Sequence, residues 1–259
     1  MSVATEHFDY RLSHLAAGKA DQYDLSFTGD PWRASLWRGE QDVLARVLRR
    51  HFSGMPATHL DFACGTGRIL SFLRDRVGRS VGVDISAEML KVAAAKVPGV
   101  RLVQADITQS DVLGDETFDL ITAFRFLANA QEELRVKALR VLARHLSPQG
   151  RLVLNNHKNH SSLLYRLGRL MRKHTRTLSH RHLCQLLRQA GLEIIQAYPL
   201  GILPATDAHM LLPAWAHRAI DATLARGPLG LELAQDIIYV CAPRDDGNPC
   251  QRHESGGPS

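Results

Sequence analysis

The chain alternates between short apolar runs and longer stretches with helical periodicity. Apolar runs rich in β-branched and aromatic residues predict strands at 60–63, 80–83, 100–105, 118–124 and 151–155. Helical periodicity predicts helices at 68–76, 87–95 and 131–145, the second with Ser86 as its N-cap and the third closed by Ser-Pro-Gln-Gly. Strands separated by helices are typical of an α/β fold with a parallel, doubly wound sheet.

Helical patterns flank this alternating region on both sides. Pro31 stands near a helix start, and apolar residues recur at helical spacing after it, so we expect an N-terminal helical cap over 1–57. After the fifth strand, the pattern predicts an amphipathic basic helix at 162–173 and a further helix at 179–190, which Ser179 caps.

The last third of the chain predicts two further strands, at 192–198 and 233–241. Between them we expect a helical insert at about 203–230, bounded by prolines. The segment 244–259 is polar and rich in Gly and Pro, which predicts a disordered tail. The chain therefore divides into the N-terminal cap, one domain over 58–243 and the tail.

Glycines and carboxylates mark the ends of three consecutive predicted strands. The first strand carries Asp61 and runs into a turn with Gly65 and Gly67, whose missing Cβ atoms let the backbone lie against a ligand. The next two strands end in Asp84 and Asp106. Because ligands bind beyond the carboxyl ends of parallel strands, these ends predict a nucleoside pocket in which Asp84 accepts both ribose hydroxyls.

Each of these residues also has a purely structural interpretation. The two glycines can form a tight turn with no ligand, and Asp84 can assist Ser86 at a helix entry. Asp106 can hydrogen-bond an adenine amine or simply end a strand. A dinucleotide fingerprint fits less well, since the glycine expected three residues beyond its second glycine is Leu70 here.

The segment HLDFACGTGR at 59–68, followed by VGVDIS at 81–86 and VQADIT at 103–108, resembles the class I S-adenosylmethionine-dependent methyltransferases. The resemblance covers roughly 58–198. It implies S-adenosylmethionine as the cofactor and a Rossmann-like, mainly parallel sheet of seven strands, whose last strand runs antiparallel beside the fifth. The segment DIIYVC at 236–241 is apolar enough for that strand. The long helical insert departs from the short hairpin common there and suggests a substrate lid or an interface.

The resemblance also implies roles for individual residues. The glycines would line the cofactor, Asp84 would hold its ribose, and Ile85 would pack on its adenine. Phe124 and Arg125 would lie where cofactor and acceptor meet. Ala63 stands where the family has its earliest motif glycine, and a small side chain still allows the loop. The expected cofactor-binding residues are Asp61, Ala63, Gly65, Gly67, Asp84, Ile85, Asp106, Ile107, Phe124 and Arg38, with Tyr23 and Arg33 as alternatives to Arg38 near the methionine carboxylate.

Composition narrows the class of protein. Hydrophobic residues make up 45% of the 259 residues, yet no apolar run reaches the roughly 18–20 residues that a membrane helix needs. The N-terminus lacks the apolar region of a signal peptide. The four cysteines are scattered and form no CxxC pair. We therefore expect free thiols, a cytoplasmic location and no metal site.

The net charge of +6 is unevenly distributed. The segment 134–192 contains 13 Lys and Arg and no Asp or Glu, whereas the remainder has 19 basic and 26 acidic residues. Such a stretch either attracts an anionic partner or forms a solvated basic face. Phosphorylated small molecules, acidic glycans, nucleic acid and anionic lipid surfaces all qualify as partners. Nucleic acid is less favoured, because only 6% of the residues are aromatic and stacking platforms are scarce.

Methyl transfer from a sulfonium mainly requires alignment of the acceptor and exclusion of water, with a general base where the acceptor is a hydroxyl. His157, just past the fifth strand, is the candidate base, and Arg125 can position an anionic acceptor. Both can instead make only local structural contacts. The sequence thus predicts a methyltransferase for a small-molecule or sugar-containing, anionic acceptor, with oxygen as the expected site. The alternatives are methylation of RNA or another macromolecule through the basic stretch and a non-catalytic binding module.

Overall fold

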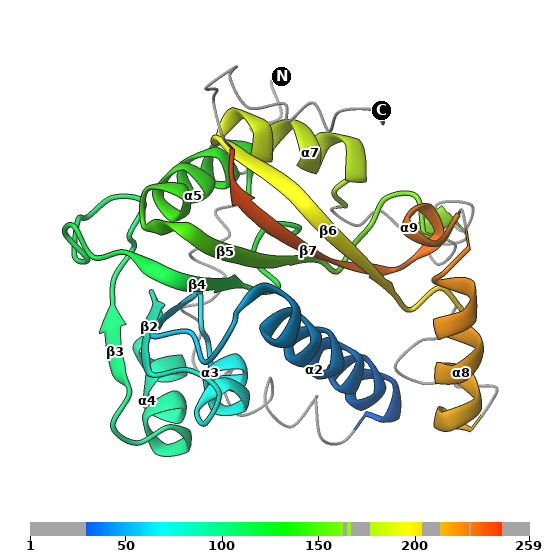
Figure 1. The fold of residues 1–259 in the computed structure, drawn as a ribbon, viewed down its shortest axis with the longest axis horizontal. Coiled ribbons are helices and arrows are strands. Elements are labelled where there is room, and N and C mark those ends of the chain that lie inside the picture. Colours follow the sequence, from blue (N-terminus) through cyan, green and yellow to red (C-terminus); the bar gives the residue numbers. More distant parts are fainter. Residues whose placement is uncertain (1–29, 163–164, 167–176, 204–212, 228, 245–259) are drawn as a thin grey trace, which may run out of the picture.

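The computed structural model describes residues 30–162, 165–166, 177–203, 213–227 and 229–244, which form one central sheet with helices on both faces (Figure 1). The elements in chain order are α2 (Pro31–His51), β1 (Thr58–Phe62), α3 (Arg68–Leu73), β2 (Arg79–Asp84), α4 (Ala87–Lys96), β3 (Arg101–Gln104), β4 (Phe118–Ala123), α5 (Glu132–Arg144), β5 (Leu146–Asn156), α7 (His180–Gln189), β6 (Leu192–Leu200), α8 (Ala214–Leu224), α9 (Gly230–Leu233) and β7 (Asp236–Pro243).

The seven strands lie in the order β3-β2-β1-β4-β5-β7-β6. The five strands from β3 to β5 pair in parallel, and β7 is antiparallel to both β5 and β6. This confirms the expected α/β fold, including the antiparallel last strand beside the fifth. The strand order reverses between β1 and β4, and a parallel sheet opens a ligand crevice at such a switch point.

Two layers of helices cover the sheet. Leucines and alanines of α5 and α7 pack with the apolar side chains of β1, β4 and β5 in one core cluster. On the opposite face, Val43, Leu44 and Val47 of α2 pack with Ile69 and Leu73 of α3. Burial of both faces explains why the central strands are apolar almost throughout.

Local sequence explains where the main helices begin and end. The Asp30 side chain accepts hydrogen bonds from the backbone of Trp32 and Arg33, and Pro31 occupies the first turn of α2. Ser86 caps α4, as predicted, through the backbone nitrogen of Met89. Ser179 caps α7 in the same way, and Gly191 follows that helix at φ +73°.

The structure corrects two predicted boundaries. The Ser-Pro-Gln-Gly segment is not a turn that closes α5, because β5 already begins at Leu146 and Phe118 of β4 pairs with it across a register shift. A Cβ at Gly150 would lie 2.9 Å from the Phe118 carbonyl oxygen, so glycine permits this close approach of strands. Leu233 is not the start of the last strand: it ends the short helix α9, and β7 begins at Asp236.

Several predicted segments lie outside the described residues: 1–29 of the N-terminal cap, most of the basic helix at 162–173, part of the insert at 204–212, and 245–259 of the tail. The described part of the insert contains α8 and α9, joined to the sheet at β6 and β7. No helix in the described ranges is long and apolar enough to cross a membrane.

Candidate active site

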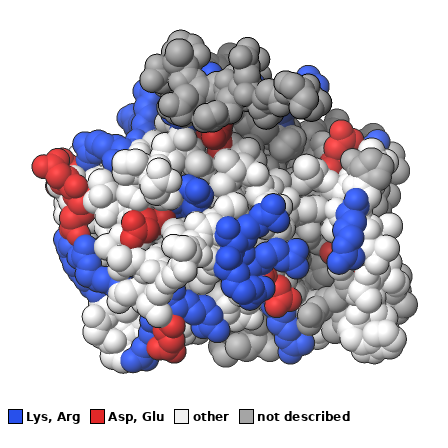
Figure 2. All heavy atoms as spheres, in the orientation of Figure 1, with Lys and Arg blue, Asp and Glu red and all other residues white. Residues whose placement is uncertain are grey.

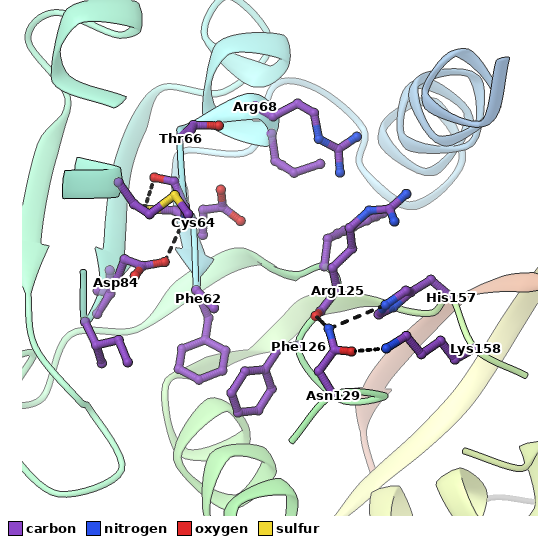
Figure 3. Close-up of a pocket in the computed structure, with 18 of the residues that line it drawn as sticks. Phe62, Cys64, Thr66, Arg68, Asp84, Arg125, Phe126, Asn129, His157 and Lys158 are labelled. Atoms are coloured by element: carbon purple, nitrogen blue, oxygen red, sulfur yellow. Dashed lines mark hydrogen bonds between the residues drawn. The ribbon is translucent and has the colours of Figure 1, made fainter. Parts of the chain in front are cut away.

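A cavity of about 390 Å³ opens at the switch point of the sheet. Its wall is formed by the carboxyl ends of β1, β2, β4 and β5, the first residue of β7, and the start of α2. Figure 3 shows its two sides, with Cys64 and Asp84 from the ends of β1 and β2 facing Arg125, His157 and Lys158 across the cavity.

The turn after β1 has a left-handed backbone at three positions. Ala63, Gly65 and Gly67 have φ values of +55°, +53° and +75°. This conformation costs a residue with a Cβ free energy, and glycine adopts it freely. Ala63 and Gly65 line the cavity. Gly67 instead begins α3 and faces α4, since a Cβ there would lie 3.1 Å from that of Ala93.

Asp84 ties the end of β2 to the glycine turn. Its Oδ2 accepts a hydrogen bond of 2.8 Å from the Gly65 backbone nitrogen, and its Oδ1 accepts one of 2.9 Å from the Ser86 backbone nitrogen. Burial raises the pKa of Asp84, and these backbone donors oppose the rise. The carboxylate therefore has the structural role at the helix entry and also lines the cavity, where its remaining lone pairs can accept from a ligand.

Asp106 lies on the same side of the cavity, beyond β3. Its Oδ1 accepts hydrogen bonds from the backbone nitrogen and the hydroxyl of Thr108, and its Oδ2 accepts one from the Gln109 side chain. These contacts hold the loop after β3 in shape, so Asp106 combines a turn-forming role with a position on the cavity wall.

Asp61 is buried at the floor of the cavity. Its Oδ1 accepts a hydrogen bond of 2.7 Å from the Thr122 hydroxyl, while its buried Oδ2 has no hydrogen-bond partner. Burial raises the pKa of this carboxyl to about 7, against the opposing effects of Thr122 and Arg68. An orphaned carboxylate oxygen in a cavity is suited to a cationic ligand that donates a hydrogen bond.

A buried carboxylate of α2 holds two arginines at the cavity. Glu40 is fully buried, and its oxygens lie 2.5 Å from Arg68 Nη1 and 3.3 Å from Arg125 Nη2. Burial opposes its ionisation, but the two guanidinium groups outweigh that effect and lower the pKa of Glu40. Arg68 also lies over the ring of Trp37, 4.1 Å from its centroid. These ion pairs connect α2 to the start of α3 and to the loop after β4.

His157 and its neighbours form the opposite wall. Lys158 Nζ donates to Asn129 Oδ1, which fixes the orientation of the amide, so Asn129 Nδ2 faces His157 Nε2 as a donor at 3.5 Å. The ring therefore carries its proton on Nδ1, which is buried and has no partner. Burial, with Arg125 and Lys158 nearby, holds the pKa of His157 well below its ordinary value.

Asp236, the first residue of β7, lies beside the end of β5. Its two oxygens accept hydrogen bonds of 3.2 and 3.0 Å from the Asn155 amide, whose own oxygen accepts one of 2.6 Å from the Arg125 backbone nitrogen. Burial, with Glu40 nearby, raises the pKa of Asp236 to about 7. Tyr165, which also lines the cavity, has its pKa raised to about 12 by burial and by Asp236.

Comparison with known proteins identifies the family. Residues 60–150 match the sequence model of a methyltransferase domain. The chain is 30% identical over 183 residues to a 2-phytyl-1,4-naphtoquinone methyltransferase of Thermosynechococcus vestitus, with 59% of this chain and 80% of that protein covered. The chain belongs to the class I S-adenosylmethionine-dependent methyltransferases.

Two further similarities describe this methyltransferase. It is 31% identical over 157 residues to a dTDP-4-amino-2,3,4,6-tetradeoxy-D-glucose N,N-dimethyltransferase of Saccharopolyspora spinosa, with 60% of each chain covered. The first curated relatives are matched over only about half to three fifths of their length. The fold resembles that of magnesium protoporphyrin IX methyltransferase from Synechocystis, solved with bound SAH, with a TM-score of 0.60, 15% identity, and coverage of 89% of this chain and 96% of that one.

Most of the residues that the sequence singled out meet at this one cavity of the methyltransferase. Those that line it are Asp61, Ala63, Gly65, Asp84, Ile85, Asp106, Phe124, Arg125, His157 and Arg33. Three others do not: Gly67 packs on α4, Ile107 is buried in the core, and Arg38 is exposed on α2. Tyr23 lies outside the described residues. Cofactor contact by each residue stays a prediction.

Sequence reasoning missed Glu40, Arg68 and Asp236. A signal for Glu40 was present, because it falls on the apolar face of α2 between Leu36 and Val43, where a charge needs a partner. Asp236 likewise stands inside the predicted strand 233–241, at the start of its apolar segment, where a charge also needs a partner. The pairing of Glu40 with Arg68 and Arg125 brings together three distant parts of the chain and has no local sequence pattern.

Proposed function

We propose that this methyltransferase transfers the methyl group of S-adenosylmethionine to an amino group of a small, sugar-containing acceptor. The observation that carries the proposal is one cavity with two chemically different sides. One side has the glycine turn with Asp61, Asp84 and Asp106, and the other has Arg125, His157 and Asp236. The dTDP-amino-sugar N,N-dimethyltransferase among the relatives supports nitrogen as the methylated atom.

On the cofactor side, Asp84 accepts hydrogen bonds from the ribose hydroxyls and Ile85 packs on the adenine. Asp61 fits a cation, because its buried Oδ2 faces no donor of the protein. S-adenosylmethionine carries an ammonium group that can donate to it, and its sulfonium supplies the methyl group to be transferred. The left-handed turn at Ala63 and Gly65 lets backbone lie beside the amino-acid part of the cofactor.

On the acceptor side, we assign proton removal to Asp236. With S-adenosylmethionine bound, its sulfonium would supply the methyl group to the lone pair of the acceptor nitrogen and leave as SAH, and the nitrogen would become an ammonium. The new ammonium then gives a proton to the Asp236 carboxylate. A pKa of about 7 suits this transfer near neutral pH. His157 has a depressed pKa and is the weaker base, although its free Nδ1–H can donate to an acceptor oxygen.

Arg33 and Lys158 on the cavity wall support an acceptor that carries phosphate. The stretch 134–192 supports a macromolecular acceptor less well. Arg135 is buried and donates to the Leu127 carbonyl, and Arg144 pairs with Asp111 at 2.8 Å. On the face shown in Figure 2, Lys and Arg are interspersed with Asp and Glu.

The test uses a dTDP-linked 4-amino sugar and its 4-hydroxy counterpart as acceptors, with SAH formation and the mass of one added methyl group as readouts. We expect methylation of the amino sugar and little of the hydroxy sugar. Asp236→Asn should lower kcat at least tenfold and leave cofactor affinity unchanged. Methylation of the hydroxy sugar would instead support oxygen transfer with His157 as base. If neither sugar is methylated although S-adenosylmethionine binds, the proposed class of acceptor is refuted.

Two further outcomes bear on the alternatives. Salt-sensitive binding of generic RNA would favour a nucleic-acid acceptor. Failure to bind S-adenosylmethionine in calorimetry would favour a non-catalytic module.

A further inference from the structure

A row of polar side chains crosses three strands beneath the glycine turn. His59 and Asp61 point to the same face of β1, since alternate residues of a strand do. His59 Nε2 lies 2.8 Å from the Thr122 hydroxyl of β4, and that hydroxyl lies 2.7 Å from Asp61 Oδ1. His59 Nδ1 lies 3.1 Å from the Ser80 hydroxyl of β2. His59, Thr122 and Asp61 are all buried, in a sheet whose neighbouring positions are apolar.

The direction of every hydrogen bond in this row follows from Asp61, the residue at one end of the row. An ionised Asp61 can only accept, so the single proton of the Thr122 hydroxyl is donated to it. The Thr122 oxygen must then accept from His59, which places the ring proton on Nε2. His59 Nδ1 is left as an acceptor and takes the proton of Ser80. Burial lowers the pKa of His59 to about 3, so the ring stays neutral and keeps this tautomer.

The row stabilises the ionised state of the Asp61 carboxyl group. Each donor is oriented toward the carboxylate, and hydrogen bonds in such a chain polarise one another. The other groups that act on Asp61 are Arg68, which lowers its pKa, and Asp84, which raises it. The neighbouring Cys64 thiol has its pKa raised by burial and by both carboxylates, so it remains protonated and uncharged.

We propose that His59 and Thr122 are positioning residues that act through Asp61, holding its Oδ2 ionised and aimed at the ammonium group of the bound cofactor. The inference rests on the proposed cofactor site and adds residues of the sheet interior to it. Neither His59 nor Thr122 lines the cavity, so any effect they have on binding must pass through Asp61.

The test is calorimetric titration of the full chain with SAH between pH 6 and pH 9. SAH retains the ammonium group and has no sulfonium, so it isolates this contact. In the wild type, affinity should fall as pH falls through the pKa of Asp61. Thr122→Val keeps the shape and removes the donor, so affinity at pH 7 should fall about tenfold and the midpoint of the pH profile should move to higher pH. His59→Phe should move it in the same direction by less.

Thr122→Ser is the matched control, because it keeps the hydroxyl and should restore the wild-type midpoint. An affinity loss in Thr122→Val that is equal at every pH would show a packing effect and overturn the proposal, as would an unchanged profile. If Thr122→Val does not fold, the comparison of Thr122→Ser with His59→Phe tests the proposal. The pH midpoint of SAH affinity should then lie higher in His59→Phe than in Thr122→Ser, and equal midpoints would overturn the proposal. Absence of SAH binding by the wild type would instead refute the cofactor site itself.

Discussion

The Gly65 backbone nitrogen donates a hydrogen bond of 2.8 Å to Asp84 Oδ2, and this contact joins the ends of β1 and β2. The glycine turn and the carboxylate are therefore one unit, and the turn keeps its shape without help from a ligand. A site organised in this way loses little freedom when a ligand binds.

Substitution of Asp84 should separate its two roles. Asp84→Ala removes the acceptor of both backbone nitrogens and the proposed ribose contact, so we expect SAH affinity to fall at least 100-fold. Asp84→Asn keeps one oxygen to accept and should retain more of the thermal stability while still losing cofactor affinity. Calorimetry and thermal unfolding of the two proteins measure these effects. Wild-type affinity in Asp84→Ala would contradict the ribose assignment.

Ala63 has the left-handed backbone that the family's glycine would adopt, with φ +55°. Ala63→Gly should relieve this strain and raise the free energy of unfolding by up to about 1 kcal/mol, because the relief exceeds the added freedom of the unfolded chain. Ala94→Gly in α4 is the control and should lower the free energy of unfolding by roughly 0.5–1 kcal/mol. Urea unfolding of both variants provides the measurement. Destabilisation by Ala63→Gly would contradict the prediction, because it would mean that packing of the Ala63 methyl group contributes more than the backbone strain costs.

The fold was predictable because its signals are local. Strand ends such as Asp84 and caps such as Ser86 and Ser179 act within a few residues, and the structure has each where the pattern indicated. The error at β5 arose because a segment such as Ser-Pro-Gln-Gly favours a turn. In the structure Gly150 instead allows β4 and β5 to approach each other closely. This role depends on the pairing of two strands, which a local sequence pattern does not contain.

The site was predictable only in part, for the same reason. The cofactor side follows consecutive strand ends, whose order along the chain is also their order in space. The acceptor side combines α2, the loop after β4 and the start of β7, so the contact of Glu40 with Arg125 spans 85 positions. Asp236 lies at the site because β7 pairs antiparallel with β5. The spacing of residues along the sequence does not predict this pairing.

The buried carboxylate of Glu40 should be a main stabilising element of α2. Glu40→Gln leaves Arg68 and Arg125 without a buried counter-charge, and we expect a loss of about 3 kcal/mol in the free energy of unfolding. Asp111→Asn, which breaks the exposed pair with Arg144, should cost less than about 1 kcal/mol. Chemical unfolding followed by circular dichroism measures both. Equal effects of the two substitutions would mean that the Glu40 cluster adds no more than an ordinary surface pair.

Asp236 should make the ligand-free protein less stable as pH rises. Its folded-state pKa of about 7 lies above the ordinary value of 3.8, so the folded state binds the proton more tightly than the unfolded state. The stability from this group is full below about pH 3.8 and is lost as pH rises through 7. Asp236→Asn cannot ionise, so its melting temperature relative to wild type should rise between pH 5 and pH 8 by on the order of 5 °C. Glu116→Gln is the control, because Arg101 and Arg79 lower the pKa of Glu116 and its stabilising effect is lost only as pH falls below the ordinary value of 4.5, so its difference from wild type should stay constant between pH 5 and pH 8. A difference between Asp236→Asn and wild type that stays constant with pH would contradict the raised pKa and, with it, the assignment of Asp236 as proton acceptor.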